Sequence, residues 1–157
     1  MQKISPFLWF DGKAEEAAEF YISVFPNSKI GDILRNGPDG PGPQGSVLTV
    51  AFELDGQEFT ALNGGPHYKF SPATSFVVNC ETQDEVDYYW EKLSAGGKTM
   101  QCGWLDDKYG VTWQVVPSVL VKMLQDKDAE KAHRVMQTMM QMVKLDIKPL
   151  QQAYDGK

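Results

Sequence analysis

The side chains that could carry out catalysis are few in this chain and stand far apart. It has two histidines, His67 and His133, and two cysteines, Cys80 and Cys102. With the histidines so placed, neither a Ser/His/Asp nor a Cys/His nucleophile arrangement can be built. Two cysteines also form neither a disulfide framework nor a four-thiolate zinc site. The residue types therefore favour ligand binding through neutral groups over nucleophilic chemistry.

Charge and hydropathy exclude several other classes. The 157 residues have a net charge of −6, which argues against a nucleic-acid partner. We find neither a run of about 18 apolar residues nor a signal-peptide pattern, and therefore expect no membrane partner and a cytoplasmic location. Residues 1–116 carry 8 basic and 16 acidic side chains, whereas residues 117–157 carry 7 and 5. This contrast predicts a separate C-terminal segment on an acidic body.

Periodicity predicts alternating strands and helices up to Pro117 and helices beyond it. Amphipathic helices are expected at 14–25 and 83–94, the second capped by Thr82 with Glu85 in a capping box. The Asp55-Gly56 pair predicts a hairpin, and the Gly/Pro-rich residues 36–45 predict a loop outside any sheet. Strands are expected at 4–10, 29–35, 46–54, 57–62, 74–80, 98–104 and 111–116, and C-terminal helices at 118–124, 129–143 and 148–154.

The two halves of the body repeat one pattern. The first helix, with Glu16 and Tyr21, aligns at a constant offset with the second, with Glu85 and Trp90. Each half therefore has a strand, a helix and about three strands. We predict an α+β fold in which two tandem βαβββ modules, about 1–65 and 73–117, form a curved mixed sheet around a cleft. Together they make one domain, 1–117, followed by a C-terminal helical appendage, 118–157.

This duplicated pattern resembles the vicinal oxygen chelate superfamily, which includes glyoxalase I, extradiol dioxygenases and the fosfomycin- and bleomycin-resistance proteins. Within it, the chain resembles the PhnB-like family, whose members are often labelled 3-demethylubiquinone-9 3-methyltransferase. The residues give that label no support, because no Gly-rich turn between a strand and a helix is present to hold S-adenosylmethionine. The matching stretches are 6–28, 61–80, 82–97, 102–117 and 135–153.

The resemblance implies where a superfamily metal site would lie. Its ligand positions fall on Pro6, Ser75 and Gln114, with the fourth on Ala61 or Asn63. Proline offers no side-chain ligand, serine is a poor one and glutamine is neutral, whereas such sites use imidazoles and carboxylates. We therefore expect no cofactor. A divalent metal held by relocated ligands, such as His67 or Gln114, is kept as an alternative.

Strand alternation then predicts the lining of a ligand site. It combines neutral hydrogen-bonding groups, one thiol and an aromatic wall, which suits a small organic molecule. Trp9 and Trp113 are instead expected to pack against the helices. Asn63 alternatively caps a turn, and Cys102 is alternatively an inert packing residue. The predicted ligand-binding residues are Asn63, His67, Ser75, Cys102, Trp104, Thr112 and Gln114.

The sequence thus predicts a homodimeric protein that binds a small organic ligand in the cleft without metal. One alternative is a metal-dependent lyase, isomerase or dioxygenase of the same superfamily with relocated ligands. A ubiquinone-type methyltransferase is the least favoured alternative. Whether the protein is an enzyme is left open, and no catalytic residue is assigned.

Overall fold

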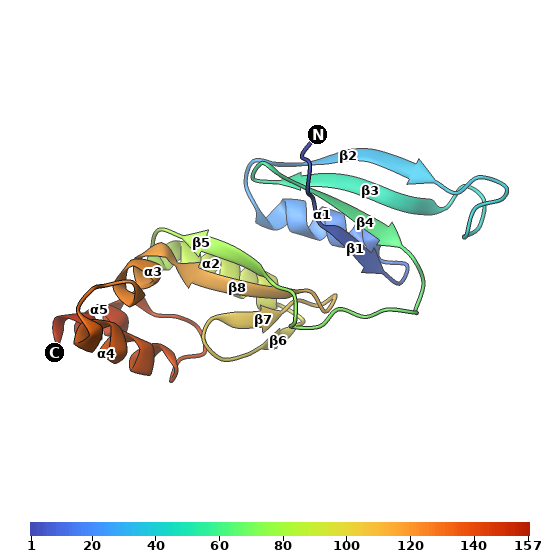
Figure 1. Cartoon of the computed structure of the whole chain (residues 1–157). Coiled ribbons are helices and arrows are strands. Elements are labelled where there is room, and N and C mark those ends of the chain that lie inside the picture. Colours follow the sequence, from blue (N-terminus) through green and yellow to red (C-terminus); the bar gives the residue numbers. More distant parts are fainter. The chain divides into compact units, whose positions relative to one another are not determined.

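The computed structural model describes residues 1–157, which form two compact units, Met1–Phe70 and Ser71–Lys157 (Figure 1). No helix is both long enough and apolar enough to span a bilayer. The first unit contains β1 (Phe7–Phe10), α1 (Ala14–Val24), β2 (Ser28–Arg35), β3 (Val47–Leu54) and β4 (Gln57–Asn63). The second contains β5 (Phe76–Cys80), α2 (Gln83–Ser94), β6 (Lys98–Thr99), β7 (Trp104–Asp106), β8 (Thr112–Pro117), α3 (Ser118–Leu124), α4 (Ala129–Met139) and α5 (Ile147–Asp155).

The predicted α+β class with two tandem βαβββ modules is confirmed. Each module forms its own four-stranded mixed sheet, with strand order β1-β4-β3-β2 in the first unit and β5-β8-β7-β6 in the second. In each, the first strand pairs in parallel with the last, and the remaining pairs are antiparallel. The predicted hairpin joins β3 to β4, and its turn residues Asp55 and Gly56 both have positive φ, as a two-residue type I′ turn requires.

The core of the first unit lies between its sheet and α1. The helix presents a face of small residues, including Ala14, Ala17 and Ala18, which lets it approach the sheet closely. Tyr21 adds an aromatic anchor, because its ring stacks on Phe52 with 6.1 Å between centroids. Leu8 and Phe10 of β1 are buried, whereas Trp9 between them is only partly buried. Alternation therefore turns Trp9 away from the core, and its predicted packing against the helix is wrong.

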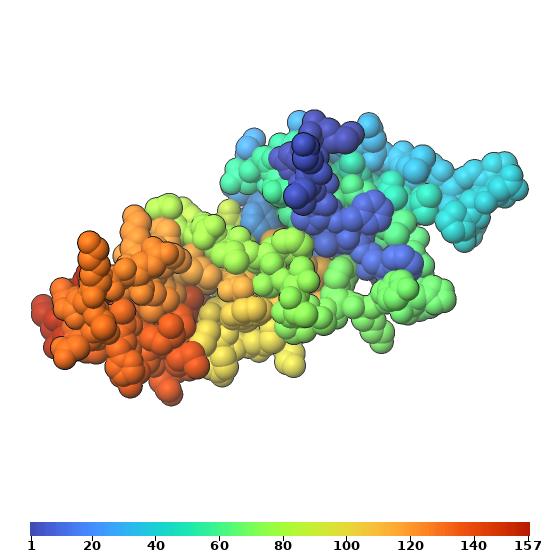
Figure 2. All heavy atoms as spheres, in the orientation of Figure 1, coloured from blue at the N-terminus to red at the C-terminus, as the bar shows by residue number.

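The Gly/Pro-rich segment 36–45 lies outside the sheet, as predicted. Its ends are joined because the Asn36 N–H donates to the Ser46 carbonyl at 2.8 Å and the Gly45 N–H donates to the Asn36 carbonyl at 2.7 Å. The buried Asn36 side chain also donates to Ser46 Oγ at 2.9 Å. In the space-filling view this loop, in cyan, projects beyond its sheet (Figure 2). A single buried asparagine therefore organises a glycine- and proline-rich loop.

In the second unit, α2 covers the face of the sheet that carries Trp113 and Val115. The predicted packing of Trp113 is confirmed, and its indole N–H donates to the buried Asp107 carboxylate at 2.9 Å. Thr82 caps α2 as expected by accepting from the Glu85 N–H at 3.2 Å. The Glu85 carboxylate accepts from Glu81, one residue before the cap, so the capping box is displaced by one position.

The single strand predicted at 98–104 is wrong. The structure has two short strands, β6 and β7, separated by a turn in which Cys102 and Gly103 have φ values of 60° and 83°. The Gly103 carbonyl accepts from the Val115 N–H at 2.8 Å, and the Cys102 N–H donates to the Met142 carbonyl at 2.9 Å. These bonds to distant segments fix a left-handed turn that the local apolar pattern does not reveal.

Helices α3, α4 and α5 belong to the second compact unit and surround a hydrophobic cluster of their own. The cluster consists of Leu120, Met123, Val135, Leu145 and Leu150. Gln83 of α2 fastens the segment before α5, because its amide donates to the Leu145 carbonyl at 3.1 Å and accepts from the Ile147 N–H at 2.8 Å. The Lys144 ammonium lies 2.8 Å from the Asp87 carboxylate on the same helix as Gln83.

This attachment predicts a pH dependence of stability. Hydrogen bonds from Lys144 and then from Gln83 hold the pKa of Asp87 below its usual value of 3.8. The interaction therefore stabilises the folded protein above pH 3.8 and is lost as the pH falls below that value through the folded-state pKa. We expect Lys144→Gln to lower stability at neutral pH and to reduce its acid dependence.

Urea unfolding at neutral pH and at a pH below 3.8 measures this difference. Lys148→Gln is the matched control, because Lys148 is an exposed lysine of the same segment that forms no ion pair. Equal acid dependence in the two variants would show that the Lys144–Asp87 pair contributes nothing to the attachment.

Candidate functional site

The strand register brings several predicted site residues onto one face of the second sheet. Gln114 of β8 lies opposite Val77 of β5 and opposite Trp104 of β7. In the next row, Thr112 lies opposite Asp106. Trp113 and Val115 alternate with Thr112 and Gln114 along β8 and face α2. Both rows therefore lie on the face of the sheet that is turned away from this helix. We call it the outer face, and its members are Ser75, Val77, Asn79, Lys98, Trp104, Asp106, Thr112, Gln114 and Val116.

Two side-chain hydrogen bonds organise the polar groups of the outer face. The Gln114 amide donates to Ser75 Oγ at 2.9 Å, and the Thr112 hydroxyl donates to Asp106 Oδ1 at 2.6 Å. Thr112 is buried, so its hydroxyl serves to position the Asp106 carboxylate. Val77 is 50% exposed, which makes it an open apolar surface beside the amide. The face therefore offers aromatic, aliphatic and hydrogen-bonding groups in neighbouring positions.

Asp106 also belongs to this face, although it is not among the site residues predicted from the sequence. It falls between the strands predicted at 98–104 and 111–116, whereas in the structure it is the last residue of β7 and pairs with Thr112. Its alternation with Leu105, which is fully buried, puts it on the same face as Trp104. The alternation of Trp104, Leu105 and Asp106 could have indicated a strand with Asp106 on the same face as Trp104. The strand predicted at 98–104 ended too early to include Asp106.

Cys102 does not lie on the outer face. It was predicted to share a strand face with Trp104, but it occupies the left-handed turn between β6 and β7. Its thiol lies 3.6 Å from the Met139 carbonyl and 3.9 Å from the Met140 sulfur. The reason is the turn itself, which directs Cys102 toward the C-terminal segment.

Asn63 and His67 lie in the first unit, and their roles as ligand contacts remain predictions. The side-chain Oδ1 of Asn63 accepts from the Ala14 N–H at 2.8 Å, and its side-chain amide donates to the Val47 carbonyl at 3.0 Å. Lys13 stands at the N-cap position of α1 but makes no side-chain capping hydrogen bond, and Asn63 supplies this bond instead. His67 is exposed in the segment that follows β4.

Trp9 lines the face of the first sheet that is turned away from α1. Its indole N–H donates to the Gly65 carbonyl at 2.9 Å, and its ring meets the Tyr68 ring edge-on at 4.9 Å. A Cβ at Gly64 would collide with the same indole ring, so the glycine lets the chain cross Trp9 closely. The Gly64-Gly65 pair therefore serves this packing.

The residues at the implied metal positions do not fit a metal. Pro6 has no donor, Ser75 and Gln114 are bonded to each other, and both polar groups of Asn63 bond to the backbone. Within each unit, no group of three His, Cys, Asp or Glu side chains is arranged to hold a metal ion. This donor set differs from the imidazoles and carboxylates of catalytic zinc and manganese sites.

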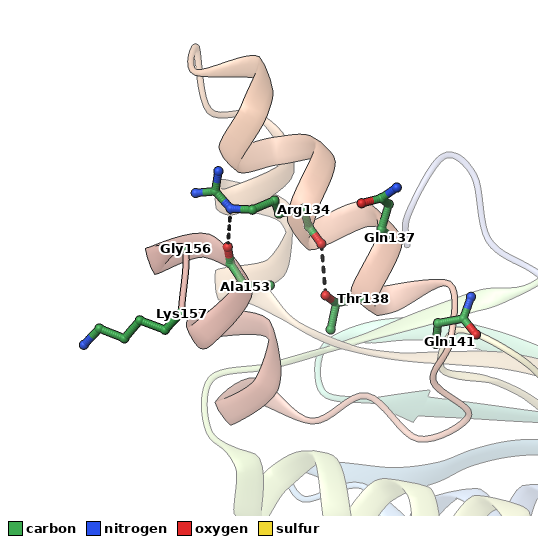
Figure 3. Close-up of a pocket in the computed structure, with 7 residues that line it drawn as sticks. All are labelled: Arg134, Gln137, Thr138, Gln141, Ala153, Gly156 and Lys157. Carbon is green, nitrogen blue, oxygen red and sulfur yellow. Dashed lines mark hydrogen bonds between the residues drawn. The ribbon is translucent and has the colours of Figure 1, made fainter.

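A shallow cavity of about 510 Å³ between α4 and α5 contains none of the predicted site residues (Figure 3). Arg134 lines it, but its guanidinium donates to the carbonyls of Ala153 and Tyr154 at 2.7 and 3.0 Å. The arginine therefore bonds to carbonyls at the end of α5 and stabilises the helix terminus. Thr138, another lining residue, donates to the Arg134 carbonyl. Two of the polar side chains that line this cavity, Arg134 and Thr138, are therefore engaged in structural hydrogen bonds.

The outer face, rather than the cavity between α4 and α5, is therefore the candidate site. The fold of the chain is similar to that of several solved structures. FosX, a fosfomycin resistance protein from Listeria monocytogenes solved with Mn(II) and sulfate, aligns over 80% of this chain and 98% of its own with a TM-score of 0.54 and 14% identity. A protein from Pseudomonas aeruginosa aligns over 74% and 98% with a TM-score of 0.62 and 20% identity. The chain therefore shares the fold of FosX, which is the fold that the resemblance to the vicinal oxygen chelate superfamily implied.

The family is defined by closer matches. Residues 2–116 match the family described as 3-demethylubiquinone-9 3-methyltransferase. A Bacillus cereus structure described with the same activity and as a PhnB protein is 42% identical, with a TM-score of 0.69 over 74% of this chain and 100% of its own. The chain therefore belongs to this PhnB-like family. No curated protein matches it.

The Asn63 contacts predict a structural effect of mutation. Asn63→Ala removes the cap of α1 and leaves the Val47 carbonyl without its donor, so we expect a loss of about 1–2 kcal/mol of unfolding free energy. Asn79→Ala, at an exposed asparagine, is expected to change it by less than about 0.5 kcal/mol. Urea unfolding measures both. An unchanged Asn63→Ala would contradict the capping role.

The two thiols are predicted to react differently. Burial, and then the nearby charges of Glu85 and Glu81, raise the pKa of Cys80 to about 12. Cys80 is fully buried, whereas Cys102 is partly exposed. Because the thiolate is the reactive form, iodoacetamide should label Cys102 and spare Cys80 in the native protein, with both labelled in urea. Peptide mass spectrometry reads the sites, and native labelling of Cys80 would contradict this environment.

Proposed function

We propose that the protein binds a small organic molecule on the outer face of its second sheet, without a resident metal. The observation that supports this most directly is the row Trp104–Gln114–Val77 across β7, β8 and β5. An aromatic ring, an amide and a half-exposed valine stand side by side there. Small-molecule sites combine apolar walls with a few placed polar groups in this way.

The polar groups of the face are suited to binding rather than to nucleophilic chemistry. Ser75 accepts from Gln114, and neither His nor Cys lies beside the Ser75 hydroxyl on this face to activate it. Gln114 retains an amide oxygen and a second N–H for a ligand. The face can therefore hold and orient a molecule through hydrogen bonds.

The methyltransferase named in the family description has little support here. The turns that lead from β1 into α1 and from β5 into α2, residues 11–13 and 81–82, contain a single glycine, Gly12, and form no Gly-rich loop that would hold S-adenosylmethionine. A metal-dependent reaction like that of a superfamily enzyme remains the second candidate, because FosX was solved with Mn(II). Such a reaction would need metal ligands at positions other than those that the superfamily resemblance implied.

We also propose a cytoplasmic homodimer. Both cysteines are free thiols, as a reducing compartment would keep them. Light scattering after size-exclusion chromatography tests the dimer.

A thermal-shift screen of small organic compounds tests the binding function. It includes S-adenosylmethionine and fosfomycin, each with and without Mn²⁺, and elemental analysis of the untagged protein accompanies it. We expect an organic ligand that stabilises the metal-free protein, with binding weakened about tenfold by Gln114→Ala because one hydrogen-bonding amide is lost. Gln151→Ala, at an exposed glutamine of α5, is the control.

Three results would overturn the proposal. About one tightly held metal per chain, needed for binding, would favour the metal-dependent alternative. Binding of S-adenosylmethionine would favour the methyltransferase. Ligand binding that Gln114→Ala leaves unchanged would place the site elsewhere.

A further inference from the structure

We propose that the ligand of the outer face is an organic cation, with an amine held between the Asp106 carboxylate and the Trp104 ring. This inference rests on the binding function proposed above. It adds the charge and the chemical class of the ligand, which the neutral residues predicted from the sequence did not specify.

The first argument is the spacing of the two groups. Trp104 and Asp106 are two residues apart on β7 and share the outer face. Alternate residues of a strand lie about 6.8 Å apart, and a cation interacts with an indole within about 6 Å of its centroid. One ammonium group can therefore lie over the edge of the Trp104 ring while donating a hydrogen bond to Asp106.

The second argument is the free capacity of the carboxylate. Thr112 donates to Oδ1 of Asp106, which fixes the orientation of the carboxyl group, while no side chain donates to Oδ2. The Trp104 ring, in the adjacent row, is only partly buried. The fold thus holds an acceptor in place and leaves one oxygen available to a ligand, which a cationic donor uses best.

The third argument is the charge around the site. Lys98 lies opposite Asp106 on the edge strand β6 and therefore shares its face, but Lys98 is exposed and forms no ion pair with Asp106. The Asp106 carboxylate therefore has no cationic partner within the protein. A cationic ligand can supply that partner through a charge-assisted hydrogen bond.

The aliphatic residues of the face explain the rest of the ligand. Val77 and Val116 lie on the same face as Trp104, and Val77 is half exposed. They provide an apolar surface next to the charged group. The site is therefore suited to an amine that carries a hydrophobic or aryl part, rather than to a small hydrophilic cation.

Three probes with the same ring and different charge test this class. Phenethylammonium, 2-phenylethanol and 3-phenylpropionate are titrated into ¹⁵N-labelled full-length protein, and the indole N–H resonances are followed by NMR. Trp104→Leu identifies the Trp104 resonance. We expect phenethylammonium to shift this resonance, the alcohol to bind more weakly and the anion to bind most weakly of the three.

Asp106→Asn tests the carboxylate while keeping an oxygen that accepts from Thr112. We expect it to weaken phenethylammonium binding about tenfold and to leave 2-phenylethanol binding almost unchanged. Glu91→Gln removes one negative charge from an exposed position on α2. It therefore controls for the long-range effect of the protein's net charge on cation binding. Its effect should be less than about twofold.

The outcomes separate this inference from the proposed function. If 3-phenylpropionate or 2-phenylethanol binds at Trp104 as tightly as the amine, or if Asp106→Asn and Glu91→Gln act alike, the cation assignment is wrong but the face remains the ligand site. If none of the three probes shifts the Trp104 resonance, the cation assignment is wrong, whatever the compound screen finds. If the ligand found by that screen also leaves Trp104 unshifted, the proposed function fails as well.

Discussion

The left-handed turn at Cys102 and Gly103 is the constraint on which the second unit depends. Its backbone is held from two sides, by Val115 of β8 and by the Met142 and Val143 carbonyls of the C-terminal segment. Gly103 is needed there because a Cβ would lie 2.8 Å from the Val115 carbonyl oxygen. By ending β6 and starting β7, this turn decides that Trp104 and Asp106 share the outer face and that Cys102 does not.

The two modules have the same strand order but differ in what stabilises their sheets. In the first unit, β2 is eight residues long and pairs along β3, and the sheet closes over a helix with a small, alanine-rich face. In the second, the corresponding strand β6 has only two residues. The C-terminal segment compensates, because it bonds to the turn after β6 and is fastened to α2 through Gln83.

The chemistry of the candidate site follows from which polar groups the fold has already used. Asn63 is engaged by two backbone groups, and Asp107 accepts from the Tyr109 and Val111 N–H groups as well as from Trp113. These buried groups are structural because an unpaired polar group would be costly there. Gln114 and Asp106 differ, since each has one internal partner and keeps further hydrogen-bonding capacity on an outward face.

The sequence by itself determined the elements with strong local signals. The amphipathic helices, the Thr82 cap, the Asp55-Gly56 hairpin and the βαβββ repeat depend on side-chain periodicity and turn chemistry within a few residues. The shared face of Thr112 and Gln114 followed in the same way from strand alternation. Only the tertiary structure decided the break at Cys102, the orientation of Trp9 and the capping role of Asn63. Each of these depends on hydrogen bonds or packing with segments distant in the chain, such as Met142, Gly65 and Ala14, and no local pattern of residues encodes such partners.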